Sequence, residues 1–197
     1  MPMKKGDKTK ERITRAATRL IHTRGYKNTS LDDIFAESGV NKGSFYFHFA
    51  GKDELVNAAI DRFFGGIERR LAPLFNGPGT SLAKLSAYMD GLAWLMERSG
   101  CTGGCLLGNL TLEVSDWHGE LRDHLSACFD RLKGLLVQVI AEGQRSGEIR
   151  SDRSADQLAT FVLALVEGAL MLSRVTKDIE PLRALSGDAL AFLRAVN

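Results

Sequence analysis

The sequence is poor in the features that mark exported, membrane-spanning or catalytic proteins. It has only three cysteines in 197 residues, an odd number that does not suit a framework of structural disulfides. The opening residues are too polar for a signal peptide. The longest apolar run, near residues 161–172, is interrupted by Glu167 and is too short to cross a bilayer. These absences predict a soluble, cytoplasmic protein with reduced thiols and no membrane contact.

No Gly-rich phosphate loop, paired-carboxylate motif or paired metal-ligand motif is present either. We therefore expect no cofactor and no enzyme activity. One enzyme hypothesis stays open, in which Cys101 and Cys105 form a redox pair or Cys105 and His118 act as nucleophile and base.

Charge is distributed unevenly along the chain. Residues 1–52 carry 11 Lys and Arg against 5 Asp and Glu, whereas residues 53–197 carry 15 against 19. This asymmetry is typical of a basic head that meets a polyanion and an acidic body that does not. A solvated helix face explains the same charges, so the charge pattern alone leaves both interpretations open.

Apolar spacing predicts helices and no strand. In KTKERITRAATRLIHTRGY, apolar residues such as Ile13 and Leu20 recur at helical spacing, while Arg12, Arg15 and Arg19 lie outside that stripe. Later helices are expected near residues 80–99, 104–115, 118–146, 154–177 and 181–196. The predicted fold is all-α, with a small N-terminal head over residues 1–52 and a larger helical bundle over residues 53–197.

The head contains two short helices joined at ESGVNKG. Ser30 and Asp33 form a capping-box-like start for the first, Gly39 ends it, and Asn41 is the expected N-cap of the second. A fourth helix is expected from Ala50 or Gly51 to near Pro73.

This arrangement matches a helix-turn-helix, whose second helix enters the major groove of DNA. Small and polar residues suit the start of such a helix, and the sequence places Asn41, Lys42, Gly43 and Ser44 there. Phe45 and Phe49 are four residues apart and are expected in the core. Tyr46, Phe47 and His48 are then left for the DNA side.

The stretch TSLDDIFAESGVNKGSFYFHFAGKDEL closely resembles the DNA-binding signature of TetR/AcrR-family transcriptional regulators. The resemblance is specific over residues 10–56 and rests on helix number and length beyond them. It implies that Lys42, Ser44 and Phe47 touch base edges, and that Thr29, Tyr46, His48 and Lys52 grip phosphates. Gly51 and Phe47 depart from the usual residues of the family. A phenyl ring at position 47 can read only apolar features such as a thymine methyl.

The residues from Lys4 to Lys10 form a basic arm that we expect to be disordered in solution. Its charges would add salt-sensitive affinity for DNA. A purely solubilising tail is the alternative.

In the second domain, the amphipathic helices near residues 154–177 and 181–196 have two explanations. The resemblance implies that they form a homodimer interface, which places two heads on a palindromic operator. Packing within one chain accounts for the same apolar stripes.

The resemblance also implies a pocket for a small-molecule effector. Its candidate lining residues are mostly apolar with a few polar groups: Trp94, Met96, Leu106, Asn109, Leu110, Glu113, Trp117 and Phe161. Cys105 and Cys101 are the candidate sensor residues beside them.

CTGGC places Cys105 at the start of a helix, where unpaired N–H groups favour a thiolate. The segment is similar to that of a TetR subgroup that responds to quinones, N-ethylmaleimide, reactive aldehydes or acrylate-like compounds. Modification of Cys105 could therefore release DNA. Three alternatives stay open: a structural Cys105 with a reversible apolar ligand, a metal site recruiting Cys101, Cys105, His118 or His124, and a DNA-binding scaffold without an effector. Cys128 is expected to be structural.

Overall fold

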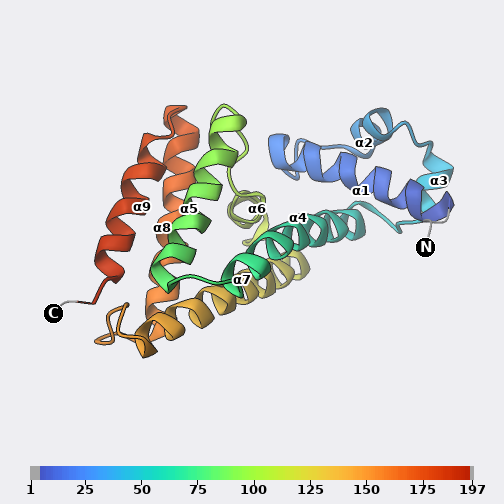
Figure 1. Ribbon diagram of the computed structural model, residues 1–197. Helices are drawn as coiled ribbons and strands as arrows, with labels where there is room; N and C mark the ends of the chain where they lie inside the picture. The colour runs from blue at the N-terminus through green and yellow to red at the C-terminus, as the bar shows by residue number, and fades with distance from the viewer. Residues whose placement is uncertain (1–4, 196–197) are drawn as a thin grey trace. The chain divides into compact units, whose positions relative to one another are not determined.

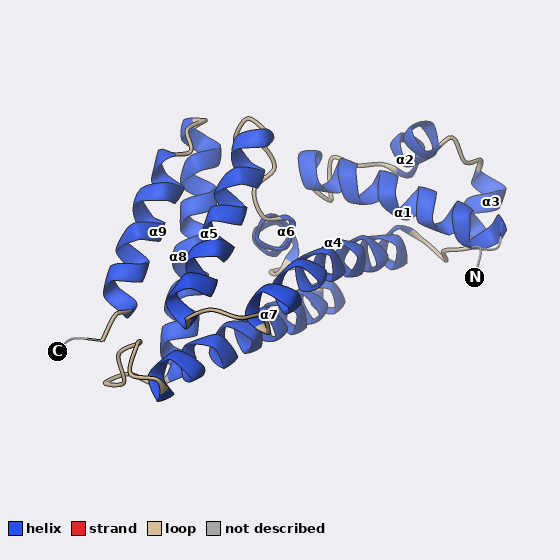
Figure 2. Ribbon diagram, in the orientation of Figure 1, coloured by secondary structure: helices blue, strands red, loops and turns tan. Residues whose placement is uncertain are grey.

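The computed structural model describes residues 5–195, and these are helical almost throughout (Figures 1 and 2). The only extended pairing among them is an isolated bridge between Ile149 and Arg194. The helices are α1 (Lys5–Arg24), α2 (Leu31–Ser38), α3 (Lys42–Tyr46), α4 (Lys52–Phe75), α5 (Ser81–Arg98), α6 (Leu106–Val114), α7 (Gly119–Arg145), α8 (Ala155–Thr176) and α9 (Glu180–Leu193). The all-α prediction is confirmed, and the five later helices begin and end within three residues of their expected bounds.

The first helix starts earlier than expected. Residues 5–10 form the opening turns of α1, so the prediction of a disordered arm is wrong for them, and Lys4 lies outside the described residues. The carbonyl of Lys10 accepts a hydrogen bond from the Thr14 hydroxyl at 2.9 Å. The Lys10 ammonium lies 5.3 Å from the centre of the Phe49 ring. These contacts tie the basic segment to the head, which offsets the entropy of ordering it.

The caps of α2 and α3 are those that the sequence predicts. The Ser30 hydroxyl accepts the Asp33 N–H at 3.0 Å, while the Asp33 carboxylate accepts the Ser30 N–H at 2.8 Å. Gly39 ends α2 with a φ of +61°, a left-handed conformation that glycine adopts without strain. Asn41 then caps α3 by accepting the Ser44 N–H at 2.8 Å. Each cap satisfies a backbone donor that the helix itself leaves unpaired.

The chain packs as two compact units. The first contains the described residues up to Gly66 together with residues 106–127, and the second contains residues 67–105 and 128–195. In this division α6 and the beginnings of α4 and α7 pack with the head, and the functional boundary expected after residue 52 stays a prediction. The core of the first unit is formed by fully or almost fully buried apolar side chains: Ile13, Ala17, Leu20, Ile34, Phe45, Phe49, Leu55 and Leu106.

The second unit is built around α5, α8 and α9, which lie side by side (Figure 1). Buried leucine, valine and methionine side chains fill the space between them. The Glu148 carboxylate closes the start of α5 by accepting the N–H groups of Ser81 and Leu82 at 2.7 and 3.0 Å. The carboxylate thus complements the positive end of the helix dipole.

By length and composition α8 could cross a membrane, but a buried helix of a soluble protein passes the same test. Part of α8 is buried against the other helices of its unit. Its apolar character therefore has a packing explanation within the chain.

Candidate functional site

The second helix of the helix-turn-helix is held by aromatic packing. Phe45 and Phe49 are 0% and 2% exposed, as the sequence predicts. The Phe45 ring lies 5.3 Å from the ring of Phe35 on α2 and 5.1 Å from that of Tyr46. Edge-to-face pairs of this kind stabilise a specific orientation as well as burying area. The short α3 is therefore fixed by its neighbours, and its remaining side chains are free to face outward.

Several residues that the sequence assigns to DNA are exposed around α3. The Phe47 side chain is 83% exposed and that of Tyr46 is 49% exposed, which is unusual for large aromatic side chains. Asn41, Lys42 and Gly43 are also exposed, while Ser44 and His48 are half-buried. These polar and aromatic residue types are ones that can contact base edges in the major groove.

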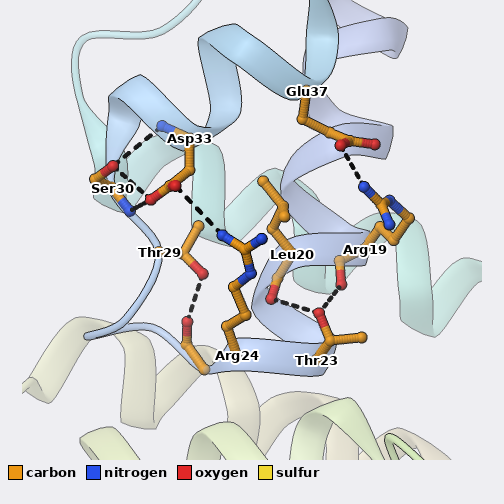
Figure 3. A network of polar contacts seen from close by, with 9 residues as sticks. Arg19, Leu20, Thr23, Arg24, Thr29, Ser30, Asp33 and Glu37 are labelled. Carbon is orange, nitrogen blue, oxygen red and sulfur yellow. Dashed lines mark hydrogen bonds and ion pairs between the residues drawn. The ribbon is translucent and has the colours of Figure 1, made fainter.

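Two expected phosphate contacts have partners inside the head. Thr29 is fully buried, and its hydroxyl donates to the Gly25 carbonyl at 2.8 Å (Figure 3). This placement does not suit a phosphate contact. The ammonium of Lys52 donates to the Tyr26 carbonyl at 2.6 Å and lies 4.1 Å from the centre of the Tyr26 ring. Burial lowers the pKa of Lys52.

The start of α2 carries a second polar network (Figure 3). The Ser30 hydroxyl donates to the Asp33 carboxylate at 2.5 Å, and this bond lowers the pKa of Asp33. The Arg24 guanidinium pairs with the same carboxylate at 3.3 Å. Because Arg24 ends α1, this ion pair links the end of α1 to the start of α2.

Glu113, a candidate lining residue of the effector pocket, holds the turn after α1. Its carboxylate accepts the N–H groups of Tyr26 and Lys27, both at 2.7 Å. Gly25, with a φ of +86°, permits this approach, since a Cβ there would lie 2.6 Å from a Glu113 oxygen. A carboxylate that accepts two backbone donors forms strong, directional bonds. The end of α6 is thereby fastened to the helix-turn-helix.

The Tyr26 side chain joins further residues to this contact. Its hydroxyl donates to Asp53 at 2.6 Å, and His118 lies 3.3 Å from the other Asp53 oxygen. Burial and the bond to Asp53 raise the pKa of Tyr26 to about 12. The Tyr26 hydroxyl, followed by His118, lowers the pKa of Asp53. We call Tyr26, Lys52, Asp53, Glu113, Trp117 and His118 the Tyr26 cluster.

Trp117 belongs to the cluster as well. Its ring lies edge-on to Tyr26 at 5.5 Å, and the Lys27 ammonium lies 5.0 Å from the Trp117 ring centre. The Trp117 indole donates to the Glu113 carbonyl at 2.7 Å. Trp117 and Glu113 therefore support the same turn.

In the second unit, the loop before α6 has an unusual backbone. Gly100, Gly103 and Gly104 have positive φ values, and so does Cys101, at 52°. Cys101 is buried, and its carbonyl accepts a hydrogen bond from Lys177 at 3.3 Å. Positive φ is costly for a residue with a side chain, so the surrounding contacts must fix this loop.

Cys105 lies at the end of that loop and is half-buried. Its thiol is hydrogen-bonded to the carboxyl group of Glu167 on α8, and burial raises the pKa of Glu167. Tyr88 on α5 is near both groups, and its pKa is raised by burial first and then by them. We call Tyr88, Cys105 and Glu167 the Cys105 cluster. It brings together a thiol and a carboxyl group that can accept its proton.

The other candidate pocket residues are divided between the units. Asn109, Glu113 and Trp117 belong to the first unit, and Trp94, Cys101, Cys105 and Phe161 belong to the second. Trp94 is 55% exposed and stacks on the guanidinium of Arg98 at 4.8 Å. Phe161 packs on Phe192 with ring centres 4.6 Å apart. The structure thus gives most of these residues partners of their own and does not gather them in one unit.

The residues considered for a metal have other partners. His124 contacts Asn57 at 2.6 Å and Asp61 at 2.9 Å, and His118 contacts Asp53. Over residues 5–195, no three His, Cys, Asp or Glu residues are grouped to hold an ion. Cys128 is buried in α7, where thiols commonly serve as small apolar side chains.

Sequence reasoning missed Tyr88 and Glu167. The available signal was the charge of Glu167 in the apolar run of α8, because a carboxyl group in such a run needs a partner or a raised pKa. Asp53 and Tyr26 gave no comparable signal.

Two family models match the chain. "Bacterial regulatory proteins, tetR family" matches residues 13–59, and "Tetracyclin repressor-like, C-terminal domain" matches residues 81–186. The first covers the helix-turn-helix, and the second alone covers more than half of the chain.

Individual relatives agree with these matches. The HTH-type transcriptional repressor DhaR of Mycobacterium sp. strain GP1 is 28% identical over 174 residues, covering 88% of this chain and 86% of DhaR. The crystal structure of a TetR transcriptional regulator from Chloroflexus aurantiacus is 31% identical, with a TM-score of 0.88 and coverage of 98% and 100%.

The structure of a cysteine-substituted CifR, a TetR-family regulator in complex with 26-bp double-strand operator DNA, shares the fold. Its TM-score is 0.83 at 20% identity, with coverage of 93% of this chain and 95% of CifR. Together with the helix-turn-helix and its exposed α3 surface, these matches show that the chain belongs to the TetR family of DNA-binding transcriptional regulators.

Proposed function

We propose that this regulator is a cytoplasmic repressor that leaves its operator when a small molecule binds or when an electrophile modifies Cys105. The observation that carries the proposal is the position of α6. This helix begins one residue after Cys105, and near its other end Glu113 fastens the turn of the DNA-binding head. A change at Cys105 therefore acts on a helix that is bonded to the head.

The DNA contacts would come from α3 and from the residues that follow it, up to the start of α4. Lys42, Ser44 and Phe47 are the proposed base contacts, and Tyr46, His48 and Lys52 the proposed phosphate contacts. CifR, whose fold is shared, is captured on double-strand operator DNA. DhaR, a more similar relative, is named a repressor.

A homodimer through α8 and α9 would place two heads on a palindromic operator. Several large apolar side chains of α8 are exposed, with Met171 at 58%, Leu172 at 41% and Val175 at 74%. At Gly168, a Cβ would meet no neighbouring atom of this chain within 4 Å. A contiguous apolar surface around a small residue suits close approach of a second helix.

The sensing reaction would be addition of the Cys105 thiol to an electron-poor alkene such as a quinone or maleimide. Sulfur forms a bond to the β-carbon, and the electrons of the double bond move to the α-carbon. The thiol proton passes to the Glu167 carboxylate, and the α-carbon takes up a proton from Glu167 or water. The sum is addition of S–H across the double bond, with no leaving group and no change of oxidation state in the protein.

Glu167 gives a different physical reason for the proposed reactivity of Cys105 than the one expected from the sequence. A helix N-terminus favours a thiolate, but a neighbouring carboxylate disfavours one. The hydrogen bond between them instead favours proton transfer during the reaction. The adduct would add bulk between α5 and α8 beside the start of α6 and shift the population toward a released state.

A DNA-binding titration tests the proposal. Wild type and Cys105→Ser are titrated against DNA from upstream of the protein's own coding region, with and without N-ethylmaleimide, and the stoichiometry is measured. Cys128→Ser is the control. We expect two chains per operator, release of wild type and Cys128→Ser by maleimide, and no release of Cys105→Ser. Release of Cys105→Ser as readily as wild type would contradict a role for this thiol. Binding undisturbed in all three would favour a reversible apolar ligand.

A further inference from the structure

The three arginines outside the apolar stripe of α1 are brought together in the first unit. Arg12, Arg15 and Arg19 follow one another at spacings of three and four residues, so they lie on one face of the helix. Together with Ala16 of α1 and with Glu37 and Ser38 of α2, they line a pocket of about 240 Å³. None of these residues belongs to the α3 surface or to the Tyr26 cluster.

Two of the arginines are anchored, and one is not. Arg12 donates to the Gly39 carbonyl at 3.4 Å, and Arg19 forms an ion pair with Glu37 (Figure 3). Within residues 5–195, Arg15 makes no ion pair. Three guanidinium groups against one carboxylate leave two excess positive charges around the pocket. Like charges at this spacing repel one another, so the site favours an anion.

The pocket also contains a buried polar group without a partner. Ser38 is 6% exposed, and its hydroxyl makes no hydrogen bond. Buried hydroxyls almost always have a partner, and an exception indicates a missing water, ion or ligand. An anion in the pocket would accept a hydrogen bond from Ser38 and from the arginines.

We propose that Arg12, Arg15, Arg19 and Ser38 form a binding site for a phosphoryl group. Guanidinium groups match the geometry of phosphate oxygens and remain charged at any physiological pH. The Ser38 hydroxyl is a further, neutral donor among the residues that line the pocket. The phosphoryl group has two sources: a backbone phosphate of DNA outside the α3 contacts, or a free phosphate or phosphate ester.

The site includes the end of the first helix of the helix-turn-helix. Ser38 ends α2, and Asn41 caps α3 only three residues later. An occupied pocket would bridge α1 and the end of α2. It would therefore stiffen the segment that leads into the DNA-reading helix.

The test compares wild type, Arg15→Gln and Ser38→Ala, with Arg70→Gln as the charge-matched control on α4. Arg70 is exposed and lies outside the pocket. Inorganic phosphate binding is measured by calorimetry at constant ionic strength, and operator binding is measured at several salt concentrations. Far-ultraviolet circular dichroism and thermal melts confirm that each variant folds.

A free phosphate site predicts saturable phosphate binding by wild type and Arg70→Gln, weakened about tenfold or more in Arg15→Gln and Ser38→Ala. A DNA phosphate site predicts that Arg15→Gln, unlike Arg70→Gln, lowers the salt slope of operator binding by about one. Either result supports the site and shows whether the bound phosphoryl group belongs to DNA or to a free phosphate. The proposal is overturned if the folded Arg15→Gln variant matches wild type in both measurements.

Discussion

The Tyr26 cluster and the Cys105 cluster both depend on carboxyl groups, but they hold them in opposite ways. In the Tyr26 cluster, Asp53 and Glu113 accept hydrogen bonds from a hydroxyl and from backbone N–H groups. Bonding lowers the pKa of Asp53, so its charged form is the stable one. In the Cys105 cluster, burial raises the pKa of Glu167, which favours the neutral, protonated form of its carboxyl group.

This difference suits two different tasks. A well-bonded carboxylate joins distant segments firmly, as Glu113 joins α6 to the turn after α1. A carboxyl group out of water can accept a proton at moderate cost, as Glu167 would from Cys105. The first unit therefore holds acidic side chains through hydrogen bonds, whereas the second buries Glu167 beside a thiol, which is the arrangement that the proposed sensing reaction needs.

The largest effect is expected from breaking the support at Glu113. Glu113→Ala removes the acceptor of two charge-assisted hydrogen bonds, which we expect to lower the unfolding free energy by roughly 2 kcal/mol. The amides of Tyr26 and Lys27 should also exchange hydrogen at least tenfold faster. Urea denaturation and hydrogen exchange measure the two effects.

Glu120→Ala is the matched control, since Glu120 is an exposed acidic residue at the start of α7 in the same unit. If Glu113→Ala and Glu120→Ala are equally stable and equally protected at residues 26 and 27, Glu113 does not support the turn.

A smaller change in stability is expected when Glu167 is replaced. At neutral pH this replacement should stabilise the protein, whereas Glu113→Ala should destabilise it. The pKa of Glu167 is higher in the folded protein than in the unfolded chain. Protonated Glu167 therefore contributes its full stability below the unfolded pKa, and this contribution is lost as the pH rises through the folded pKa. Glu167→Gln keeps a neutral group there. It should therefore raise the melting temperature at pH 7.5 by about 2–4 °C, and the gain should disappear toward pH 4.

Asp53→Asn tests the contribution of a charged carboxylate to stability in the Tyr26 cluster. The pKa of Asp53 is lowered, so its contribution is present above the unfolded pKa and is lost as pH falls through the folded one. Melting curves between pH 3 and 8 should show Asp53→Asn less stable than wild type at neutral pH, with a difference that vanishes in acid. Parallel pH profiles for the two variants would contradict the contrast between the clusters.

The sequence predicted what depends on near neighbours. The Ser30 and Asn41 caps, the burial of Phe45 and Phe49 and the extents of the later helices all follow from spacings of a few residues. The exposure of the residues around α3 was predictable to the same degree, because local helix geometry sets it. Their contacts with DNA stay a prediction.

The contacts of Glu113 could not be predicted in this way. Its partners lie 86 and 87 residues away, and neither a period nor a motif connects them. The helical start of α1 likewise depends on Lys10 meeting Phe49, a contact that only the folded head creates. Long-range polar contacts leave no periodic pattern in a single sequence, which is why the packing of α6 with the head and the hydrogen bonds of Glu113 were not predicted.

The smallest stability effect and the most specific functional one are expected at Lys52, which belongs to the Tyr26 cluster and is also a proposed phosphate contact. Its ammonium already donates to the Tyr26 carbonyl, yet it has further donors available. Lys52→Ala should change the unfolding free energy by less than about 1 kcal/mol. It should lower the salt slope of operator binding by about one unit, with a similar loss for different operators.

Lys27→Ala separates the two roles of Lys52, because Lys27 carries the same charge in the same unit and lies against Trp117 without being a proposed DNA contact. Operator titrations at several salt concentrations should give Lys27→Ala the wild-type slope and Lys52→Ala the reduced one. Equal slopes for all three proteins would leave Lys52 as a structural support only. In that case the Tyr26 cluster would join α6 to the head without touching DNA, and the phosphate contacts would have to come from Tyr46, His48 and the arginine pocket.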